Sequence, residues 1–257
     1  MMKCIKHLAF YNDWHLGDCL YSLQFLRKLC LNSKFSVDFY MEKHNEQLTN
    51  YLEDGLNLNI FFEKPPRTAH NLWLNHHGWY NRQSNRKWDE LHVQLYRHIC
   101  PKLKIRNPIK NKNDLIFDSP TLLEKTILGD EKFDFLIING RPRSGQFHYN
   151  AKDFENLVDY LIDKKHKIIT TDKIGDIPCT RDYKFNVVDI ARISLNAKNI
   201  LGVLVGPMHS TFTKFSKAER WYVLSTGETL NWSDKIYNFN SIKNIPKRMF
   251  SKPVGYL

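Results

Sequence analysis

Two strand–loop–helix patterns, about 120 residues apart, limit the folds that this chain can adopt. In the first, residues 7–11 read as a strand, Gly17 lies in a polar loop, and residues 19–29 have apolar side chains at helical spacing. In the second, an apolar strand at residues 133–139 leads into a loop with Gly140. Strands that lead through glycine-bearing loops into helices are typical of domains that bind nucleotides and phosphates.

The rest of the chain continues this alternation of strands and helices. Further strands are predicted at 35–41, 58–62, 166–171, 200–205 and 220–225, and helices at 46–52, 88–100, 151–165, 187–196 and 207–218. Such alternation predicts an α/β fold with parallel sheets, here two Rossmann-like domains facing a central cleft. A basic, proline-bearing segment places the boundary after residue 122, and the second domain then runs from 123 to 230. We expect the aromatic and basic tail, residues 231–257, to pack back across the domains.

Composition excludes several other classes of protein. With 42% hydrophobic residues among 257, the chain can bury a core, and its apolar runs are too short to cross a membrane. Its five cysteines are odd in number and widely spaced, which indicates neither a zinc site nor a disulfide framework. We therefore expect reduced cysteines and a cytoplasmic location.

The net charge of +11 favours an anionic partner without selecting one. Six cations with no acid between them lie in one tract: Arg97, Lys102, Lys104, Arg106, Lys110 and Lys112. The tract is consistent with a solvated loop, or with a surface that contacts an acidic acceptor or the membrane. We therefore expect peripheral contact with a membrane.

The segment Gly206–Thr211 predicts an anion site. Gly206 permits close backbone approach, and Pro207 opens a helix whose first-turn N–H groups lack partners within the helix. Hydroxyls of Ser210 and Thr211 could reinforce that site for a diphosphate, with Met208 and His209 in the same turn. An ordinary capped helix is the alternative interpretation.

A second candidate for phosphate binding is the loop that follows residues 133–139. Arg141 and Arg143 can pair with phosphate oxygens in a bidentate manner, with Ser144 beside them. The spacing of a Walker loop is absent. A basic surface loop without a ligand remains the alternative.

The loop after the first strand holds the candidate catalytic groups, Asp13, His15 and Asp18. A carboxylate or an imidazole at this position could take a proton from an acceptor hydroxyl. Asp18 could instead act as the N-cap of the following helix. These residues alone leave open which of the three is the base.

Aromatic and histidine side chains suggest where an acceptor binds. Trp14, His76, His77 and Trp79 form this candidate set, because rings of this kind stack on sugars or bases. Packing in the core is the alternative for the tryptophans. The spacing of the histidines is irregular, so no metal site is predicted.

These motifs resemble GT-B glycosyltransferases, and most nearly the family-9 group of bacterial lipopolysaccharide heptosyltransferases. His15–Leu29 is similar to the family's Gly-Asp loop and to its helix ending in Leu-Arg-x-Leu. The opening of the family's nucleotide-binding domain resembles residues Ile137–Ser144 together with Ile168–Asp172. The family's Gly-Pro-x-His loop is similar to Gly206–Thr211. In order and spacing the resemblance covers most of residues 5–226.

The resemblance implies an inverting, metal-independent transfer from a nucleotide-diphosphate sugar to a hydroxyl of a glycan or glycolipid acceptor, with no resident cofactor. The first domain would bind the acceptor and the second the donor. Asp13 would be the leading candidate for the base and Asp18 the second. Arg141 and Arg143 would neutralise the leaving diphosphate, and the Gly206–Thr211 turn would hold it.

The chain also departs from the family pattern. Leu204 and Val205 stand where the family usually has an acidic and a small hydroxyl residue, and Gln24 replaces a common proline. The departures leave the donor sugar open.

Two other functions are compatible with the sequence. One is a nucleic-acid-binding protein that uses the basic, aromatic surface, although no zinc-finger, RRM or KH pattern is present. The other is a different Rossmann enzyme acting on nucleotide sugars. We expect no nucleic-acid partner under the glycosyltransferase interpretation.

Overall fold

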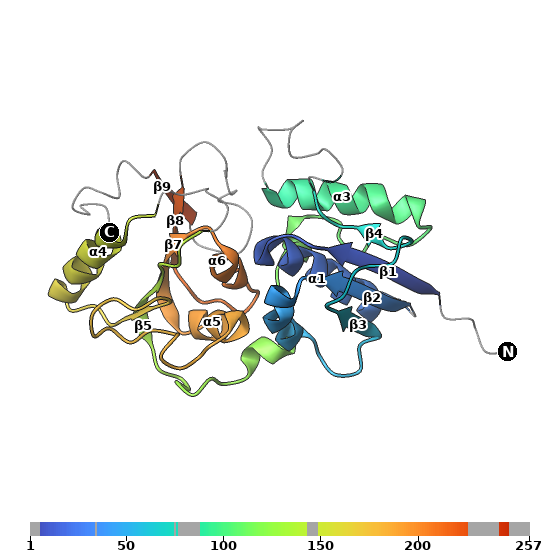
Figure 1. Cartoon of the computed structure of the whole chain (residues 1–257). Helices are drawn as coiled ribbons and strands as arrows, with labels where there is room; N and C mark the ends of the chain where they lie inside the picture. Colours follow the sequence, from blue (N-terminus) through green and yellow to red (C-terminus); the bar gives the residue numbers. More distant parts are fainter. Residues whose placement is uncertain are drawn as a thin grey trace. The chain divides into compact units, whose positions relative to one another are not determined.

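The computed structural model describes residues 6–33, 35–74, 76, 88–142, 149–225 and 242–246. The chain forms two compact units, Met1–Thr121 and Leu122–Leu257 (Figure 1). The sequence-based boundary, after residue 122, lies next to this division. Each unit is an α/β domain with its own parallel sheet.

The first unit contains a parallel four-stranded sheet with the order β3-β2-β1-β4. Its strands are β1 (His7–Asn12), β2 (Ser36–Met41), β3 (Leu58–Phe61) and β4 (His70–Asn71), and its helices are α1 (Leu16–Asn32), η1 (Lys43–Tyr51), α3 (Trp88–Lys102) and η3 (Lys112–Leu115). A fourth short helix, η4 (Pro120–Leu123), lies at the division of the units. The strand order reverses between β1 and β4, so loops that follow these two strands meet at the switch point of the sheet.

The core of the first unit lies on one face of its sheet. Along β1 and β2 the side chains alternate between buried and partly exposed positions, and Phe10 and Phe39 are fully buried. Phe10 packs edge-on against Phe25 of α1, which stacks on Tyr96 of α3 with ring centroids 4.2 Å apart. Helices α1 and α3 therefore share one core, and the alternate side chains of β1 and β2 remain partly open to solvent.

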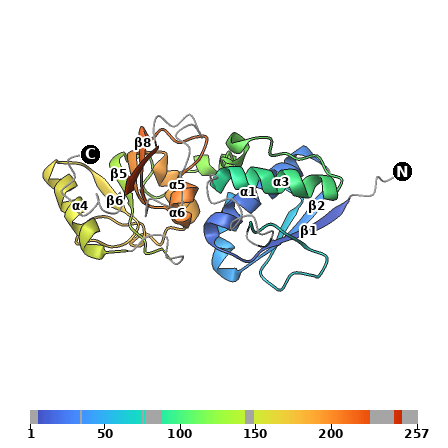
Figure 2. The ribbon, with the colours of Figure 1, turned by 90° about the horizontal axis from the view of Figure 1, so that it is seen from above.

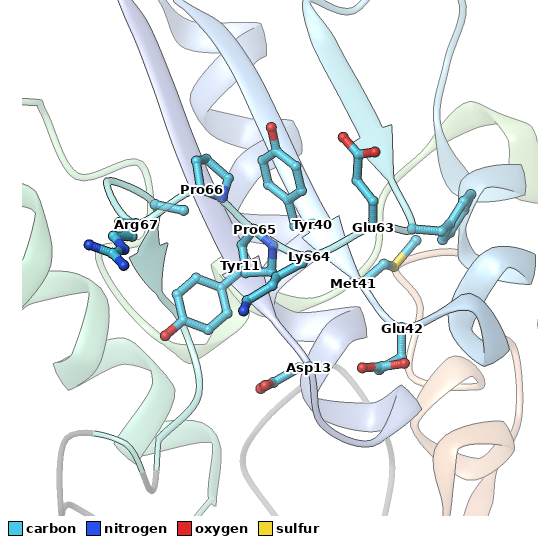
Figure 3. A pocket seen from close by; sticks show the side chains of 12 residues that line it. Tyr11, Asp13, Tyr40, Met41, Glu42, Glu63, Lys64, Pro65, Pro66 and Arg67 are labelled. Atoms are coloured by element: carbon cyan, nitrogen blue, oxygen red, sulfur yellow. The ribbon is translucent and has the colours of Figure 1, made fainter.

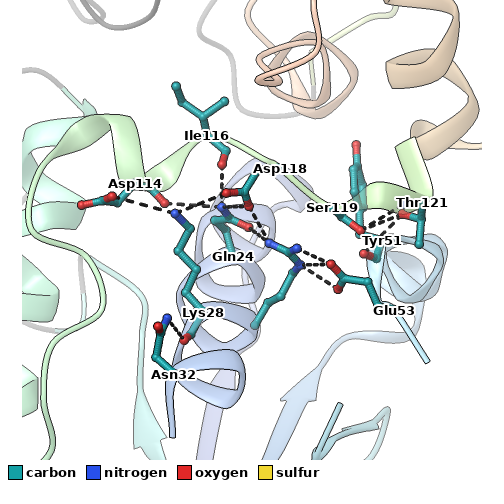
Figure 4. A network of polar contacts seen from close by, with 11 residues as sticks. Gln24, Lys28, Asn32, Tyr51, Glu53, Asp114, Ile116, Asp118, Ser119 and Thr121 are labelled. Carbon is teal, nitrogen blue, oxygen red and sulfur yellow. Dashed lines mark hydrogen bonds and ion pairs between the residues drawn. The ribbon is translucent and has the colours of Figure 1, made fainter. Parts of the chain in front are cut away.

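A polar network ties α1 to the segment that ends the first unit (Figure 4). The buried guanidinium of Arg27 donates from Nε to Glu53 at 2.7 and 2.9 Å, and from Nη1 to Asp118 at 2.6 Å. Gln24 donates to the carbonyl of Ile116 at 2.5 Å. The Arg27 and Gln24 positions of the family-like helix thus have a structural role in this chain.

The second unit contains a parallel five-stranded sheet with the order β6-β5-β7-β8-β9. Its strands are β5 (Phe133–Ile138), β6 (Ile168–Thr170), β7 (Ala197–Val203), β8 (Arg220–Ser225) and β9 (Ile242–Pro246), and its helices are α4 (Ala151–Asp163), α5 (Val187–Ser194) and α6 (Gly206–Ser210). Helix α4 covers one face, and α5 and α6 cover the other (Figures 1 and 2). The switch point lies between β5 and β7.

Strands β5 and β7 approach each other closely at Gly202. A Cβ atom on this residue would lie 2.2 Å from the carbonyl oxygen of Ile138, so no side chain fits there. The backbones on both sides of the switch point can approach this closely only with glycine at position 202.

The structure confirms the predicted α/β class with parallel sheets, and it corrects two local predictions. The helix expected at 207–218 is wrong beyond Ser210. There Ser210 Oγ donates to the carbonyl of Pro207 at 2.7 Å, and Thr211 Oγ1 donates to that of Met208 at 2.8 Å. Such side-chain bonds compete with helix continuation. The expected tail also contains an unpredicted strand, β9, which extends the second sheet next to β8.

Candidate functional site

The loop after β1 is held by buried polar side chains. Asn12 donates to Ser22 Oγ at 2.9 Å and accepts from the N–H of Trp14 at 3.1 Å. Asn45 Nδ2 donates to the carbonyl of Trp14 at 3.1 Å. The loop therefore presents Asp13, Trp14 and His15 from a fixed backbone at the carboxyl edge of the sheet.

Two tryptophans meet at the switch point of the first sheet. The indole of Trp14, 40% exposed, stacks on that of Trp73 with centroids 4.4 Å apart, and His15 packs on Trp14 at 4.6 Å. The candidate acceptor set included Trp14 but omitted Trp73, although Trp73 lies only three residues before His76. His76 is exposed, while His77 and Trp79 lie outside the described residues.

Asp13 lies at a pocket of about 520 Å³ (Figure 3). The lining comes from the ends of β1 and β2 and from the segment that connects β3 to β4: Tyr11, Asp13, Tyr40, Met41, Glu42, Phe62, Glu63, Lys64, Pro65, Pro66, Arg67 and Ala69. The volume is in the range of about 300–1,000 Å³ that is usual for small-molecule sites. No motif in the sequence predicts this pocket.

Asp18 has a different environment from Asp13. His15 is the N-cap of α1, so Asp18 is the third helical residue and not the cap. The Asp18 side chain is 6% exposed, and its Oδ1 has no hydrogen-bond partner among the described residues. Burial raises the pKa of Asp18 to about 7. A carboxyl group with this pKa can exchange a proton near neutral pH.

In the second unit, both candidate phosphate loops follow strands that flank the switch point. Arg141 follows β5 and is exposed, whereas Arg143 and Ser144 lie outside the described residues. Asn139 fixes the start of this loop: its Oδ1 accepts from the N–H of Asp172 at 2.8 Å, and its Nδ2 donates to the Asp172 carbonyl at 2.9 Å. The loop thus begins from an anchored backbone.

The loop after β7 contains the short helix α6. The hydroxyls of Ser210 and Thr211, at the end of this helix, are buried. Each donates its hydrogen bond to a carbonyl within the turn. They do not point to an anion site as the sequence led us to expect. First-turn N–H groups have no acceptor inside a helix, and here they belong to Gly206 and Met208, since Pro207 has none. Burial lowers the pKa of His209 to about 3, so its imidazole is neutral.

Among the residues that the structure describes, no group of three or more His, Cys, Asp or Glu side chains lies close enough to hold a metal ion. None of the helices in those same ranges has the length and apolarity that a membrane span requires.

No family model and no curated protein matches this sequence. Solved structures, however, share its fold. The Escherichia coli heptosyltransferase WaaC with ADP superimposes with a TM-score of 0.59 at 12% identity, over 96% of this chain and 93% of WaaC. A family-9 glycosyltransferase from Veillonella parvula gives 0.50 at 13% identity, over 95% and 86%.

A third similar structure is the iron-containing dodecameric glycosyltransferase TibC from enterotoxigenic E. coli, with a TM-score of 0.55 at 11% identity. That match covers 86% of this chain and 59% of TibC. At such identities the likeness concerns the fold, and the chain has the α/β fold of these glycosyltransferases.

Proposed function

We propose that the protein is a glycosyltransferase that moves a sugar from a nucleotide-diphosphate sugar to a hydroxyl group of a glycan or glycolipid acceptor. The shared fold supports the reaction class. WaaC has been solved with ADP and with ADP-2-deoxy-2-fluoro heptose, which supports a nucleoside-diphosphate donor. The reaction proceeds with inversion and needs neither a metal nor a resident cofactor.

The second unit binds the donor. Arg141, Arg143 and Ser144 lie next to the diphosphate, and the guanidinium groups stabilise the charge that develops on the leaving group. The N–H groups of Gly206 and Met208, with neutral His209, provide donors from the loop on the other side of the switch point. Both loops follow adjacent strands, which is where open α/β sheets bind ligands.

Asp18 is the general base. Its raised pKa matches the working pH of a base better than that of an ordinary carboxyl, and its unpartnered Oδ1 has no competing internal bond. Asp13 is exposed at the pocket and contacts the acceptor. His15 occupies the N-cap position of α1 without a side-chain capping bond, and the Trp14–Trp73 pair forms an apolar wall beside the acceptor.

The chemical step is a single displacement. The acceptor oxygen attacks the anomeric carbon as its proton passes to the Asp18 carboxylate. The bond from the anomeric carbon to the diphosphate oxygen breaks, and its electron pair leaves with the nucleoside diphosphate. One displacement inverts the configuration at that carbon.

The buried carboxyl group of Asp18 at the start of α1, whose Oδ1 has no hydrogen-bond partner among the described residues, is the observation that carries this proposal. The direct test measures the melting temperature of the full chain with UDP, GDP, ADP and CMP, first without metal and then with Mg²⁺ or Mn²⁺. A ligand at 100 times its Kd stabilises the native state by about 2.7 kcal/mol. We expect a selective, metal-independent rise with one nucleoside diphosphate.

Arg141→Ala should reduce the rise in melting temperature, because Arg141 follows the carboxyl end of β5. Lys132→Ala should not, because Lys132 precedes the amino end of the same strand. No rise with any nucleotide, together with a rise caused by single-stranded oligonucleotides, would favour a nucleic-acid-binding protein instead. We also propose that the enzyme works in the cytoplasm and contacts a membrane peripherally through the Arg97–Lys112 tract. Vesicle sedimentation with anionic lipids tests that contact.

A further inference from the structure

The pocket of the first unit is built at the carboxyl edge of its sheet. It extends from the half-exposed rings of Tyr11 and Tyr40 on the open face to the carboxylates of Asp13 and Glu42 beyond the strand ends (Figure 3). The Pro65–Pro66 segment, which connects β3 to β4, closes the other side. Three adjacent parallel strands therefore contribute to one concave site.

The aromatic side chains give this site an apolar wall. Tyr40 stacks on Phe61, its register partner on β3, with ring centroids 5.0 Å apart and planes at 19°. Tyr11 follows in the same position on the neighbouring strand, since Tyr11 and Tyr40 are register partners. Sugar rings present a face of C–H groups that packs on such rings, while their hydroxyls point to the sides.

The charges of the lining are acidic overall. The lining contains three carboxylates, those of Asp13, Glu42 and Glu63, and two cations, Lys64 and Arg67, which leaves one formal negative charge in excess. This sign is opposite to that of the whole chain, whose net charge is +11. In Figure 3 the side chains of Arg67 and Glu63 both point away from Asp13 and Glu42, and Lys64 lies nearer to these two carboxylates.

We infer that this pocket binds a sugar ring of the acceptor that carries hydroxyl or amino groups and no carboxylate or phosphate. The inference rests on the proposed function and adds the place and the chemical class of the acceptor. Carboxylates accept strong hydrogen bonds from hydroxyl and ammonium groups, and the Lys64 ammonium donates to a hydroxyl or ring oxygen. An acidic sugar would bring its charge next to Asp13 and Glu42, and like charges at such distances select against a partner.

Saturation-transfer NMR on the full chain tests this inference with simple sugars. The probes are glucose, galactose, mannose, N-acetylglucosamine and glucosamine, each compared with glucuronate, galacturonate, glucose 6-phosphate and mannose 6-phosphate. At roughly 10 mM, weak ligands with millimolar Kd are detected. We expect transfer to at least one neutral or amino sugar, and at least about 5-fold less to its acidic counterpart.

Two variants locate the binding. Tyr40→Ala should weaken the sugar signal about 5-fold, because it removes the stacking ring. Tyr183→Ala, which removes an exposed tyrosine of the second unit, should leave the signal unchanged. Glu42→Lys should raise the signal of the acidic sugars, because it reverses the local charge. Glu46→Lys is its matched control, since Glu46 is exposed on η1 and does not line the pocket.

The outcomes separate this inference from the proposed function. Acidic sugars that bind the wild type as well as neutral ones, or no sugar signal at all, would overturn the inference even if a nucleoside diphosphate raises the melting temperature. The same holds if Tyr40→Ala, still folded by its melting curve, retains the full sugar signal. Sugar binding at the pocket without any nucleotide binding would support the inference as a carbohydrate site and count against glycosyl transfer.

Discussion

Trp14 and Trp73 stack with their ring centroids 4.4 Å apart and an angle of 26° between the planes. The two residues lie 59 positions apart in the chain (73 − 14 = 59), and they meet because β1 and β4 are neighbours in the sheet. Their loops are the two that border the switch point of the first unit. An aromatic pair at this place joins the loop after β1 to the loop after β4, so the position of one depends on the other.

Replacing Trp14 should therefore be visible by spectroscopy. Two indoles in contact couple their transitions, so the wild type should show a paired positive and negative band in far-ultraviolet circular dichroism that Trp14→Phe lacks. The smaller phenyl ring should stack less extensively on Trp73, at a cost of up to about 1 kcal/mol of unfolding free energy. Trp221→Phe changes a buried tryptophan of the second unit and should keep the paired band. A Trp14→Phe spectrum identical to that of the wild type would contradict the contact.

The sequence predicted most strands of both sheets because their apolar residues follow the periods of buried parallel strands. Residues 133–138 are one example, and they form β5 as expected. Strand β9 was not predicted because Ile242 and Ile245 do not alternate with polar residues. It forms through parallel pairing with β8, which the local sequence does not reveal. The predicted helix at 207–218 failed because the hydroxyls of Ser210 and Thr211 bond to carbonyls that a longer helix needs.

The candidate site was predicted in part. The loop with Asp13, His15 and Asp18 was identified from its motif, but the contrast between an exposed Asp13 and a buried Asp18 depends on packing that no local pattern encodes. The pocket was not predicted because part of its lining comes from residues 62–69, which contain no motif. These residues lie next to the ends of β1 and β2 only because β1, β2 and β3 are adjacent in the sheet. Arg27 was noted as part of a family-like helix, and its ion pairs became evident only in the structure.

Arg27 should be among the most sensitive polar positions of the first unit. Its loss would leave Glu53 and Asp118, each with only 20% of its side chain exposed, without their shared partner. We expect Arg27→Leu to reduce the unfolding free energy by about 3 kcal/mol, and Arg27→Lys by somewhat less, because an ammonium cannot span both carboxylates. Urea unfolding curves measure both values.

The matched control for Arg27 is Lys152→Ala. Lys152 pairs with Glu155 at 3.1 Å on the surface of α4, and exposed pairs contribute about 0–1 kcal/mol. If Arg27→Leu and Lys152→Ala cost the same, the Arg27 network is not the anchor that its geometry indicates.

Gly202 should tolerate no side chain. In Gly202→Ala the new Cβ would meet backbone and not a flexible chain end, at 2.2 Å from the oxygen of Ile138, so β5 or β7 must shift. We expect a loss of about 3 kcal/mol, at the upper end of overpacking effects. Gly140→Ala should fold normally, since its nearest neighbour would be Asp172 Oδ2 at 3.8 Å. Equal melting temperatures for the two variants would contradict the close approach of β5 and β7.

Asp18 should lower the unfolding free energy near neutral pH while serving sugar transfer. Its pKa is about 7 in the folded protein and 3.8 when unperturbed, so between these values the folded state holds a proton that the unfolded state has released. Stability therefore falls as the pH rises from about 4 to 7, by on the order of 4 kcal/mol in total. Asp18→Asn carries no such charge, and it should be more stable than the wild type at pH 8 and not at pH 4.

The same substitution should abolish sugar transfer at every pH, because an amide cannot accept the acceptor's proton. Wild-type transfer should rise with pH through about 7 as Asp18 ionises. Asp13→Asn removes an exposed carboxylate and should change stability by no more than about 0.5 kcal/mol at either pH. Melting curves of the three proteins at pH 4 and pH 8, with transfer rates on the same samples, measure both effects. Asp18→Asn that transferred sugar at the wild-type rate would leave Asp13 as the base, whereas a stability gain without activity assigns the proton transfer to the buried carboxylate.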